Sequence, residues 1–454
     1  MHEFGQGARR RRFPALLALV ALIAAMVVAG CGSSGDSSSG SGSGGEGGGL
    51  GGGSSSKTDS NTVKIGLLST LEGPFATPGA ASNMGAKLAL LEHGGKLDGT
   101  GPRDGVSGAT VGGKKVQLVI DSSDATPDVA VEAERRLVEQ DNVDVSVGPL
   151  SGDEGIAIKN YAKQHLDTTF VNGTSGAQNT TLRDPAPNFF RFTTDGAQWM
   201  AGLGTYVAKD LNDKKVVTFA EDYSFPYDQV GGFMTEYCAA GGTVPKKIWV
   251  PLGTKDYASY ITQIPKDVDA VYVALGGSDA LNFTKQFDQF TGKKIPLIGG
   301  SITVDGNIIK GLGPRVEGTV SAGPVAVLNT KEYKDYAAAL KKNFPDAGPP
   351  GLFDIGYYIE MKSLLMALDQ VKGDVSGNQQ ALRDALQQVS WTTPSGPVKL
   401  DQNRQAIGDN FLFKVTNGQS ALLKTVSNVN QTLGFDRAKY IAKPPFDRAN
   451  PSCP

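Results

Sequence analysis

Histidine and cysteine, which carry much of the metal and nucleophilic chemistry of proteins, are scarce in this chain. Its 454 residues include three histidines and three cysteines. No C-x-x-C, H-E-x-x-H or clustered Cys/His sequence occurs, so we expect no metal site, and no dinucleotide fingerprint predicts another cofactor. His93 and His165 lie near predicted helix ends, where a surface role is expected. The formal net charge of −2 gives no reason to expect nucleic acid as a partner.

The first 30 residues have the pattern of an export signal. Four arginines at 9–12 precede the apolar run FPALLALVALIAAMVVAG, and Cys31 follows it. Small residues directly before a cysteine resemble a bacterial lipobox, in which residues 1–30 are removed and Cys31 is lipidated. The alternative is a transmembrane anchor, since the run approaches the length of a membrane span. The lipobox is favoured because the small residues suit a peptidase.

Residues 31–60 consist mainly of glycine and serine and cannot bury enough apolar surface to fold. We therefore expect a flexible tether between a lipid anchor and a folded body, and a protein exported to the outer face of the cell membrane. With Cys31 lipidated, Cys238 and Cys453 remain in an oxidising compartment. The prediction is a disulfide that pins the C-terminal tail, 441–454; the alternative is two free thiols.

Short apolar strands alternate with amphipathic helices from residue 63 onward, which indicates β-α-β units and parallel sheets. Strands are predicted at 63–68, 115–121, 143–148 and 168–172, with helices at 80–93, 126–141 and 153–165 between them. The pattern restarts with strands at 189–193, 214–220, 247–251, 268–275, 295–300 and 318–323, and with a helix at 197–210. The chain closes with a predicted hairpin of 397–401 and 410–418, where Asn417–Gly418 is a turn signal.

The fold class predicted from this pattern is α/β, with two doubly wound lobes of similar size. The helices at 331–344, 353–371 and 379–387 have no strands of their own and must cover a lobe already built. The chain is therefore expected to cross between lobes more than once. The predicted boundaries are 61–192 plus 324–400 for lobe 1 and 193–323 plus 401–440 for lobe 2.

The stretch VGPLSGDEG at 147–155 lies between a predicted strand and a predicted helix. A hydrolase would need glycines two positions on either side of Ser151, and His93 or His165 as its base, and this spacing is absent. Ser151 and Glu154 instead match a capping box that starts a helix. Gly152 leaves the N–H groups of that helix open to an anion at the carboxyl end of a parallel strand.

Small and aromatic residues gather at the neighbouring strand ends. Asn172, Gly173, Thr174 and Ser175 follow the next strand and offer hydroxyl and backbone groups. Aromatic residues lie in the corresponding loops, with Tyr223 and Phe225 in a loop predicted at 221–230, Phe75 in the first loop and Trp199 early in a helix. These groups include no acid, base or metal ligand, so binding without catalysis is the economical interpretation.

Several segments together resemble the type I periplasmic binding proteins of ABC importers, in the branched-chain amino acid and amide-binding group. They are VKIGLLSTLEGPFATPG, VGPLSG, FVNGTSGAQNTT, FFRFTTDGAQ, EDYSFPY and DQNRQAIGDNFLFKV, spread over residues 61–439. The resemblance implies two Rossmann-like lobes joined by three crossovers, which close on a solute like a clamshell. It also implies that Ser151, Gly152, Gly173 and Ser175 hold a ligand carboxylate, that Phe225 is the second-lobe aromatic, and that Ser278 lies in a pocket loop.

One position departs from this family's pattern. Amino acid binders of the group have a glutamate after the strand corresponding to PLIGG, where this chain has Ser301. A buried ammonium without a counter-charge is costly, and Asp222, Asp279 or Asp354 would have to replace the glutamate. Amides, urea-like compounds and aromatic or aliphatic carboxylates are therefore as well supported as leucine, isoleucine and valine. The aromatic loop favours a carboxylate with a flat or apolar body.

The predicted function is that of a monomeric, lipid-anchored receptor that delivers a small solute to the permease subunits of an ABC importer. A ligand-sensing lipoprotein of the same fold, without a transport role, shares every sequence feature. A secreted serine hydrolase that uses Ser151 is a distant alternative.

Overall fold

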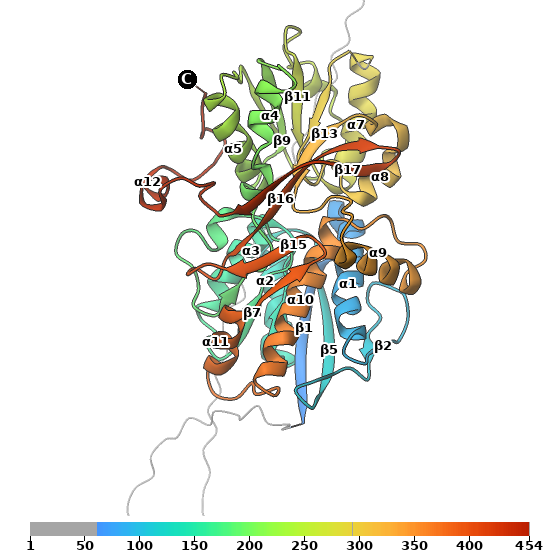
Figure 1. The fold of residues 1–454 in the computed structure, drawn as a ribbon, viewed down its shortest axis with the longest axis vertical. Coiled ribbons are helices and arrows are strands. Elements are labelled where there is room, and N and C mark those ends of the chain that lie inside the picture. The colour runs from blue at the N-terminus through green and yellow to red at the C-terminus, as the bar shows by residue number, and fades with distance from the viewer. Residues whose placement is uncertain (1–60, 293, 454) are drawn as a thin grey trace, which may run out of the picture. The chain divides into compact units, whose positions relative to one another are not determined.

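Two β-sheets, each covered by helices, organise the computed structural model of this chain, which describes residues 61–292 and 294–453 (Figure 1). The predicted export signal, Cys31 and the tether lie outside the described residues. The predicted class, two α/β lobes with doubly wound sheets, is confirmed. Within the described ranges, no helix combines the length and apolar character needed to cross a bilayer.

The first sheet surrounds β1 (Thr62–Thr70), whose side chains from Ile65 onward are all buried. The strands run in the order β4 (Thr110–Val111), β5 (Lys114–Ser123), β1, β6 (Val145–Val147), β7 (Thr169–Val171) and β8 (Phe189–Phe190), all parallel except β4. Helices α1 (Ala76–Leu91) and α10 (Leu352–Gln370) pack side by side against one face. Helices α2 (Pro127–Arg135) and α3 (Gly152–Ala162) cover the other.

The second sheet begins with five parallel strands and continues with antiparallel ones. Its order is β10 (Lys247–Val250), β9 (Val216–Glu221), β11 (Ala270–Ala274), β12 (Leu297–Gly299), β13 (Val320–Gly323), β16 (Ala406–Thr416), β15 (Gly396–Leu400) and β14 (Ser390–Thr393), with β17 (Gln419–Val429) also paired to β16. Its helices are α4 (Leu203–Lys209), α5 (Ser224–Ala239), α6 (Ala258–Ile261), α7 (Gly277–Thr291) and α8 (Gly306–Leu312). Three further helices are α9 (Lys331–Asn343), α11 (Gln380–Gln388) and α12 (Arg437–Ala442).

The predicted C-terminal hairpin is part of a larger meander. β15 pairs with residues 406–408 at the start of β16, with Val398 opposite Gly408, whereas residues 410–416 of the predicted second strand pair with β13 and β17. The Asn417–Gly418 turn, with φ of 53° and 70°, leads into β17, which the sequence pattern did not predict because most of its side chains are exposed. β14 and β15 are hydrogen-bonded into the second sheet, although they lie in the segment predicted for lobe 1. The exact boundaries between the lobes remain a prediction.

Two local expectations in the second lobe were wrong. The helix predicted at 197–210 is broken into a 3-10 turn, Gln198–Met200, and α4, because Gly202 between them has a left-handed φ of 87°. The predicted loop at 221–230 is mostly helix, since α5 begins at Ser224. Pro226 lies in the first turn of α5, where a missing backbone N–H costs no helical bond.

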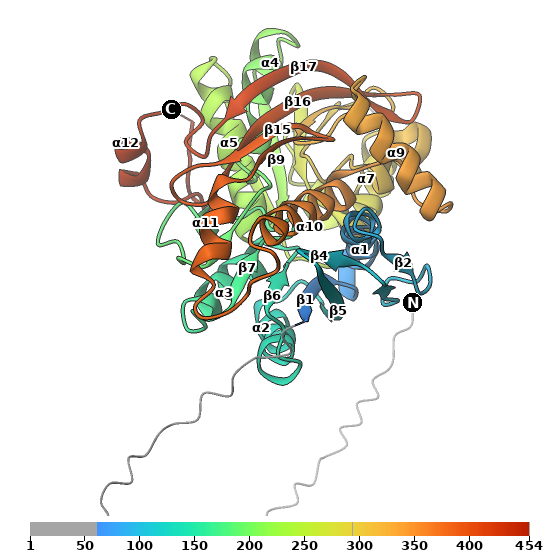
Figure 2. The same ribbon diagram turned by 60° about the horizontal axis from the view of Figure 1, so that its bottom comes forward.

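Three segments lie near the predicted lobe boundaries, at 191–194, 323–327 and 401–409, and we call them the three crossing segments. The first and third run side by side: Arg191 N–H donates to Arg404 O at 2.9 Å and Ala406 N–H donates to Arg191 O at 2.8 Å. The Arg191 guanidinium is fully buried and donates to Gln405 and to the carbonyls of Ser175 and Ala177. One buried cation thus ties the crossing segments to the loop after β7. Figure 2 shows β15 and β16 lying across the molecule above α10.

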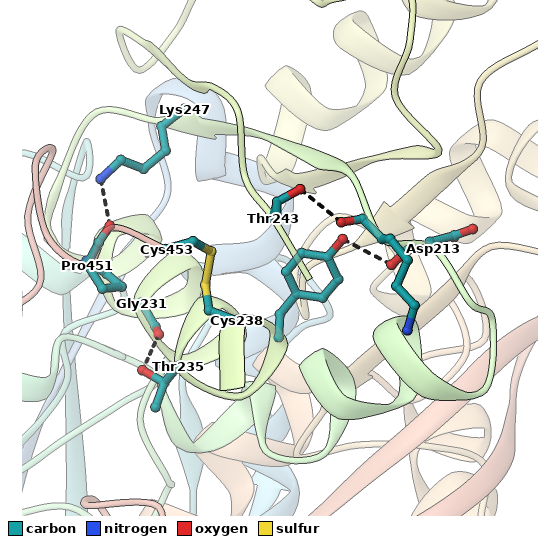
Figure 3. Close-up of a disulfide and its surroundings, with 10 residues drawn as sticks. Asp213, Gly231, Thr235, Cys238, Thr243, Lys247, Pro451 and Cys453 are labelled. Atoms are coloured by element: carbon teal, nitrogen blue, oxygen red, sulfur yellow. Dashed lines mark hydrogen bonds between the residues drawn. A yellow bond between two sulfur atoms is a disulfide. The ribbon is translucent and has the colours of Figure 1, made fainter. Parts of the chain in front are cut away.

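The C-terminal tail is attached to the second lobe by a disulfide between Cys238 of α5 and Cys453, with Cα atoms 5.4 Å apart (Figure 3). Beside the bridge, the Lys247 ammonium donates to the carbonyl of Pro451 at 2.9 Å. The Phe446 ring lies so close to Gly231 of α5 that a Cβ there would be 2.3 Å from it. The tail is therefore packed on α5 and not only tethered to it.

Candidate functional site

The site lies where the strand order of the first sheet reverses, between β1 and β6, which is the usual position for ligands in doubly wound folds. The chain turns sharply from β6 into α3 at Gly148, which has a φ of 146°. A Cβ on Gly148 would lie 2.3 Å from the carbonyl oxygen of Leu68, so only glycine fits here. This turn places Ser151 and Gly152 at the start of α3.

Ser151 is the N-cap residue of α3, and the capping-box hydrogen bond formed here is the one from its backbone N–H to the side chain of Glu154. The Glu154 carboxylate accepts the Ser151 N–H at 2.8 Å, while the Ser151 hydroxyl donates to Ala125 O at 3.1 Å. The described histidines interact elsewhere: His93 contacts Asp369, and His165 stacks on Tyr161. Among the described residues, no histidine is therefore placed to act as the base of a nucleophilic Ser151.

Glu154 lies fully buried beneath this helix start. Its Oε1 atom has no hydrogen-bond partner among the described residues. Burial raises the pKa of the Glu154 carboxyl above its ordinary value, in opposition to the hydrogen bonds from Ser123, Ser151 and Thr70. This shift favours the neutral form of the Glu154 carboxyl, whose charged form would repel an anion at the N-terminus of α3.

The first turn of α5, in the other lobe, closes over α3. The Ser224 N–H donates to Asp153 Oδ1 at 3.2 Å, and the Gln178 N–H donates to Asp228 Oδ2 at 2.7 Å. A Cβ on Gly152 would lie 2.7 Å from Ser224 Oγ and 2.8 Å from Phe225 Cβ. The structure is therefore a closed state in which the second lobe occupies the space directly above Gly152.

A narrow cavity with about 230 Å³ of space free of protein atoms remains between the two helix starts. It is lined by Phe75, Leu150, Ser151, Gly152, Thr174, Trp199, Tyr223, Phe225, Ile302, Leu352 and Phe353. Seven of these eleven are predicted site residues. Trp199 and Phe225 meet edge to face with ring centroids 5.3 Å apart, which fixes one wall. None of the described residues lining this cavity carries a charge.

Four predicted site residues do not line this cavity. Gly173 faces the Tyr357 ring, which an added Cβ would approach to 2.3 Å, and Ser175 packs against Gly155. Ser278 bonds to the adjacent Asp279 at 3.3 Å. Ser301 accepts a hydrogen bond from Gln229 and lines a separate cavity near Asp305. The loops at the strand ends are close to the site, but these four residues contact other parts of the protein.

Four lining residues were missed by the sequence analysis, namely Leu150, Ile302, Leu352 and Phe353. Leu150 and Ile302 adjoin the predicted Ser151 and Ser301, so a pattern including apolar neighbours would have found them. Leu352 and Phe353 start α10, about 200 positions after Ser151, and no local signal connects them to the site.

The three aspartates considered as replacements for the missing glutamate are bonded elsewhere. Asp222 pairs with Arg448 at 3.2 Å, Asp279 accepts the Gly253 N–H at 2.6 Å, and Asp354 accepts the Tyr336 hydroxyl at 2.8 Å. Glu221, which the sequence analysis did not single out, is fully buried and accepts the Gly276 N–H at 3.0 Å. Burial raises the pKa of Glu221 well above its ordinary value, which disfavours its charged form.

In the part of the chain that the structure describes, no three His, Cys, Asp or Glu side chains come together in a way that could hold a metal ion. The chemistry available at the cavity is therefore hydrogen bonding at the start of α3 and apolar contact with aromatic rings.

Comparison with known proteins agrees with this geometry. The sequence profile of the family described as periplasmic binding protein matches residues 62–420. A Leu/Ile/Val-binding protein homolog 6 of Brucella melitensis is 24% identical over 370 residues, covering 80% of this chain and 89% of that relative. An ABC transporter substrate-binding protein from Sphaerobacter thermophilus superposes with a TM-score of 0.71 at 26% identity, covering 82% and 99% of the two chains.

A solute-binding protein of an ABC transporter from Rhodopseudomonas palustris BisB5, solved in complex with 3,4-dihydroxybenzoic acid, has a TM-score of 0.73 at 26% identity. The superposition covers 82% of this chain and 98% of the Rhodopseudomonas chain. The family profile matches most of the sequence, and the fold and the position of the cleft between β1 and β6 agree with it. This chain belongs to the periplasmic binding protein family, as the resemblance of its motifs predicted.

Proposed function

We propose that this protein is a lipid-anchored extracytoplasmic receptor that delivers a small carboxylate with a flat, apolar body to an ABC importer. The observation that carries the proposal is the lining of the cleft cavity. Ser151, Gly152 and Thr174 present small polar groups at one side, and aromatic rings together with three aliphatic side chains form the remaining walls. A carboxylate suits the N-terminus of α3, and a ring suits Phe75, Trp199 and Phe225.

The absence of a counter-charge argues against an amino acid as the ligand. None of the described residues lining the cavity is acidic, and Ser301 stands where amino acid binders of this family have glutamate. Leaving an ammonium unpaired in such a site costs several kcal/mol, on the order of a thousandfold in affinity. The relative bound to 3,4-dihydroxybenzoic acid supports the same ligand class, because it shares this fold at 26% identity.

The proposed mechanism is ligand-stabilised closure. The α3 side of the first lobe holds the carboxylate, and α5 of the second lobe swings over it until Ser224 reaches Asp153 and Asp228 reaches Gln178. A ligand that contacts both lobes shifts the population toward this closed form. The closed form then docks on the permease subunits. A role in sensing without transport uses the same closure, and uptake measurements in a strain lacking this protein distinguish the two.

The ligand class is tested by calorimetry with the purified folded body, residues 61–454. The panel compares benzoate, 4-hydroxybenzoate and 3,4-dihydroxybenzoate with leucine, benzamide and urea. We expect the aromatic carboxylates to bind at least about tenfold more tightly than leucine or the neutral amide. Leucine binding more tightly than every aromatic acid would reject the proposed ligand class.

The lipid anchor is tested on the full chain expressed in a bacterial host. Intact-mass measurement should show removal of residues 1–30 and a mass increase from acyl chains on Cys31. The Cys31→Ser variant should lack that increase and leave the membrane fraction. Retention of residues 1–30 in the wild-type protein would instead support a transmembrane anchor.

A further inference from the structure

A second cavity lies at the hinge, on the far side of Trp199 from the cleft. It contains about 440 Å³ of space free of protein atoms, part of it open to solvent. All three crossing segments contribute to its walls, through 192–194, 324–325 and 408–409, and α10 and the β14–β15 turn complete it. A molecule in this cavity would touch all three crossing segments.

The wall between the two cavities consists of Thr174, Trp199 and Leu352, which line both. These side chains are at most 3% exposed. The Trp199 indole N–H donates to Thr194 Oγ1 at 2.8 Å, and its ring is held against Phe225. A packed, hydrogen-bonded wall makes the hinge cavity a separate compartment from the cleft.

The hinge cavity has its own chemistry. Its walls are mainly apolar, from residues such as Phe192, Val325, Ile355, Ile359 and Val398. One buried hydroxyl oxygen at this cavity, Ser395 Oγ, has no hydrogen-bond partner among the described residues. Buried polar atoms normally have partners, so this oxygen is available to a ligand.

Charge excludes the ligand class proposed for the cleft. None of the described residues lining the hinge cavity is a lysine, arginine or histidine, and the single titratable one is Asp409. Asp409 accepts the Asn428 N–H at 3.1 Å at the edge of the cavity. A second titratable group, Glu360, is bonded to the N–H groups of Phe192 and Thr193 behind the same wall. Nearby carboxylates and the lack of cations disfavour an anion, and the mainly apolar walls disfavour a charge of either sign, which leaves a neutral ligand.

We propose that the hinge cavity binds a small, neutral, mostly apolar molecule that carries one hydroxyl or N–H group, of about the size of a phenol. Its polar group bonds to Ser395, and its body packs against the apolar walls. Because this cavity is formed by the crossing segments in the closed state, its occupant favours closure. By linkage, the hinge ligand and the cleft ligand raise each other's affinity by the same factor.

The test uses p-cresol as the probe and titrates it calorimetrically into the folded body, residues 61–454. Gly408→Leu fills the cavity, and an added Cβ there makes ordinary contacts, 3.5 Å from Thr194 and 3.7 Å from the Pro397 carbonyl. Thr416→Leu, at the exposed far end of the same strand, is the matched control. We expect p-cresol affinity to fall at least about tenfold in Gly408→Leu and to stay within about twofold in the control.

Val325→Phe fills the cavity from the second crossing segment and repeats the test if Gly408→Leu does not fold. Equal p-cresol affinity in the filled and control variants, or no binding to the wild type, would overturn the proposal. None of these affinity measurements requires benzoate to bind in the cleft. The proposed hinge site can therefore be rejected without rejecting the proposed function, and the proposed function without rejecting the hinge site.

Discussion

Gly152 of α3 and Phe225 of α5 meet across the cleft so closely that a Cβ on the glycine would lie 2.8 Å from the Cβ of Phe225. The glycine was expected from the sequence to expose helix N–H groups to a solute. The structure gives it a further role, because its missing side chain lets the second lobe reach the first. We therefore propose that binding and closure depend on the same position.

Gly152→Ala should weaken ligand binding by obstructing closure. The added methyl group would overlap the backbone nitrogen of Phe225 as well as its Cβ, and a helix start cannot move as a flexible side chain does. We expect the affinity for the tightest-binding aromatic carboxylate to fall about tenfold or more, measured by calorimetry, with the melting temperature unchanged. Gly105→Ala is the control, since its Cβ would meet the end of the exposed Asp98 side chain. Equal affinity in both variants would contradict the role of Gly152.

Phe225→Ala should remove an aromatic wall of the cleft cavity. Phe225 is 4% exposed and packs edge to face on Trp199, so truncation leaves a void beside the ligand. We expect a loss of about 2 kcal/mol in the binding free energy of an aromatic carboxylate, and a smaller loss for acetate. Phe290→Ala, at a side chain 53% exposed, is the matched control and should change neither value. An equal loss for acetate and benzoate would show that Phe225 does not contact the ring.

Glu134→Gln should reduce the dependence of stability on pH. Glu134 of α2 is fully buried, and burial raises the pKa of its carboxyl to about 7. Between the ordinary glutamate value and pH 7 the folded state keeps a proton that the unfolded state has lost. The free energy of unfolding therefore falls as the pH rises through this window, by an amount on the order of 3 kcal/mol.

The glutamine variant has no proton to lose, so its denaturant midpoint should vary less between pH 5 and pH 8 and exceed that of the wild type at pH 8. Glu132→Gln, on the exposed side of the same helix, should keep the slope of the wild type. Parallel pH curves for Glu134→Gln and the wild type would show that Glu134 does not hold a proton in the folded state.

Breaking the Cys238–Cys453 bridge should destabilise the second lobe. The bridge closes a loop with a sequence separation of 215, and the tail it holds packs Phe446 on α5. We expect reduction, or the Cys238→Ser/Cys453→Ser double variant, to lower the free energy of unfolding by about 2–4 kcal/mol in guanidinium titrations. The double variant should be insensitive to reductant. Two free thiols in the unreduced, denatured protein would show that no bridge forms.

Local patterns in the sequence were sufficient to predict several structural features of this protein. The alternation of strands and helices predicted two α/β lobes, the S-x-x-E pattern predicted the helix start at Ser151, and Asn417–Gly418 predicted a hairpin turn. The helix start and the turn depend on hydrogen bonds within a few residues of the chain, and the alternation reflects which side chains each strand and helix buries, so the residue types themselves report these features.

Only the tertiary structure decided which strand-end residues face the cleft. Gly173 and Ser301 have the residue types of a binding loop, yet Tyr357 covers the first and Gln229 holds the second. Phe353 reaches the cavity from a helix far along the chain. The hinge cavity likewise exists only because three separate segments cross at one place. Contacts between distant segments determine these features, and no local pattern in one sequence records them.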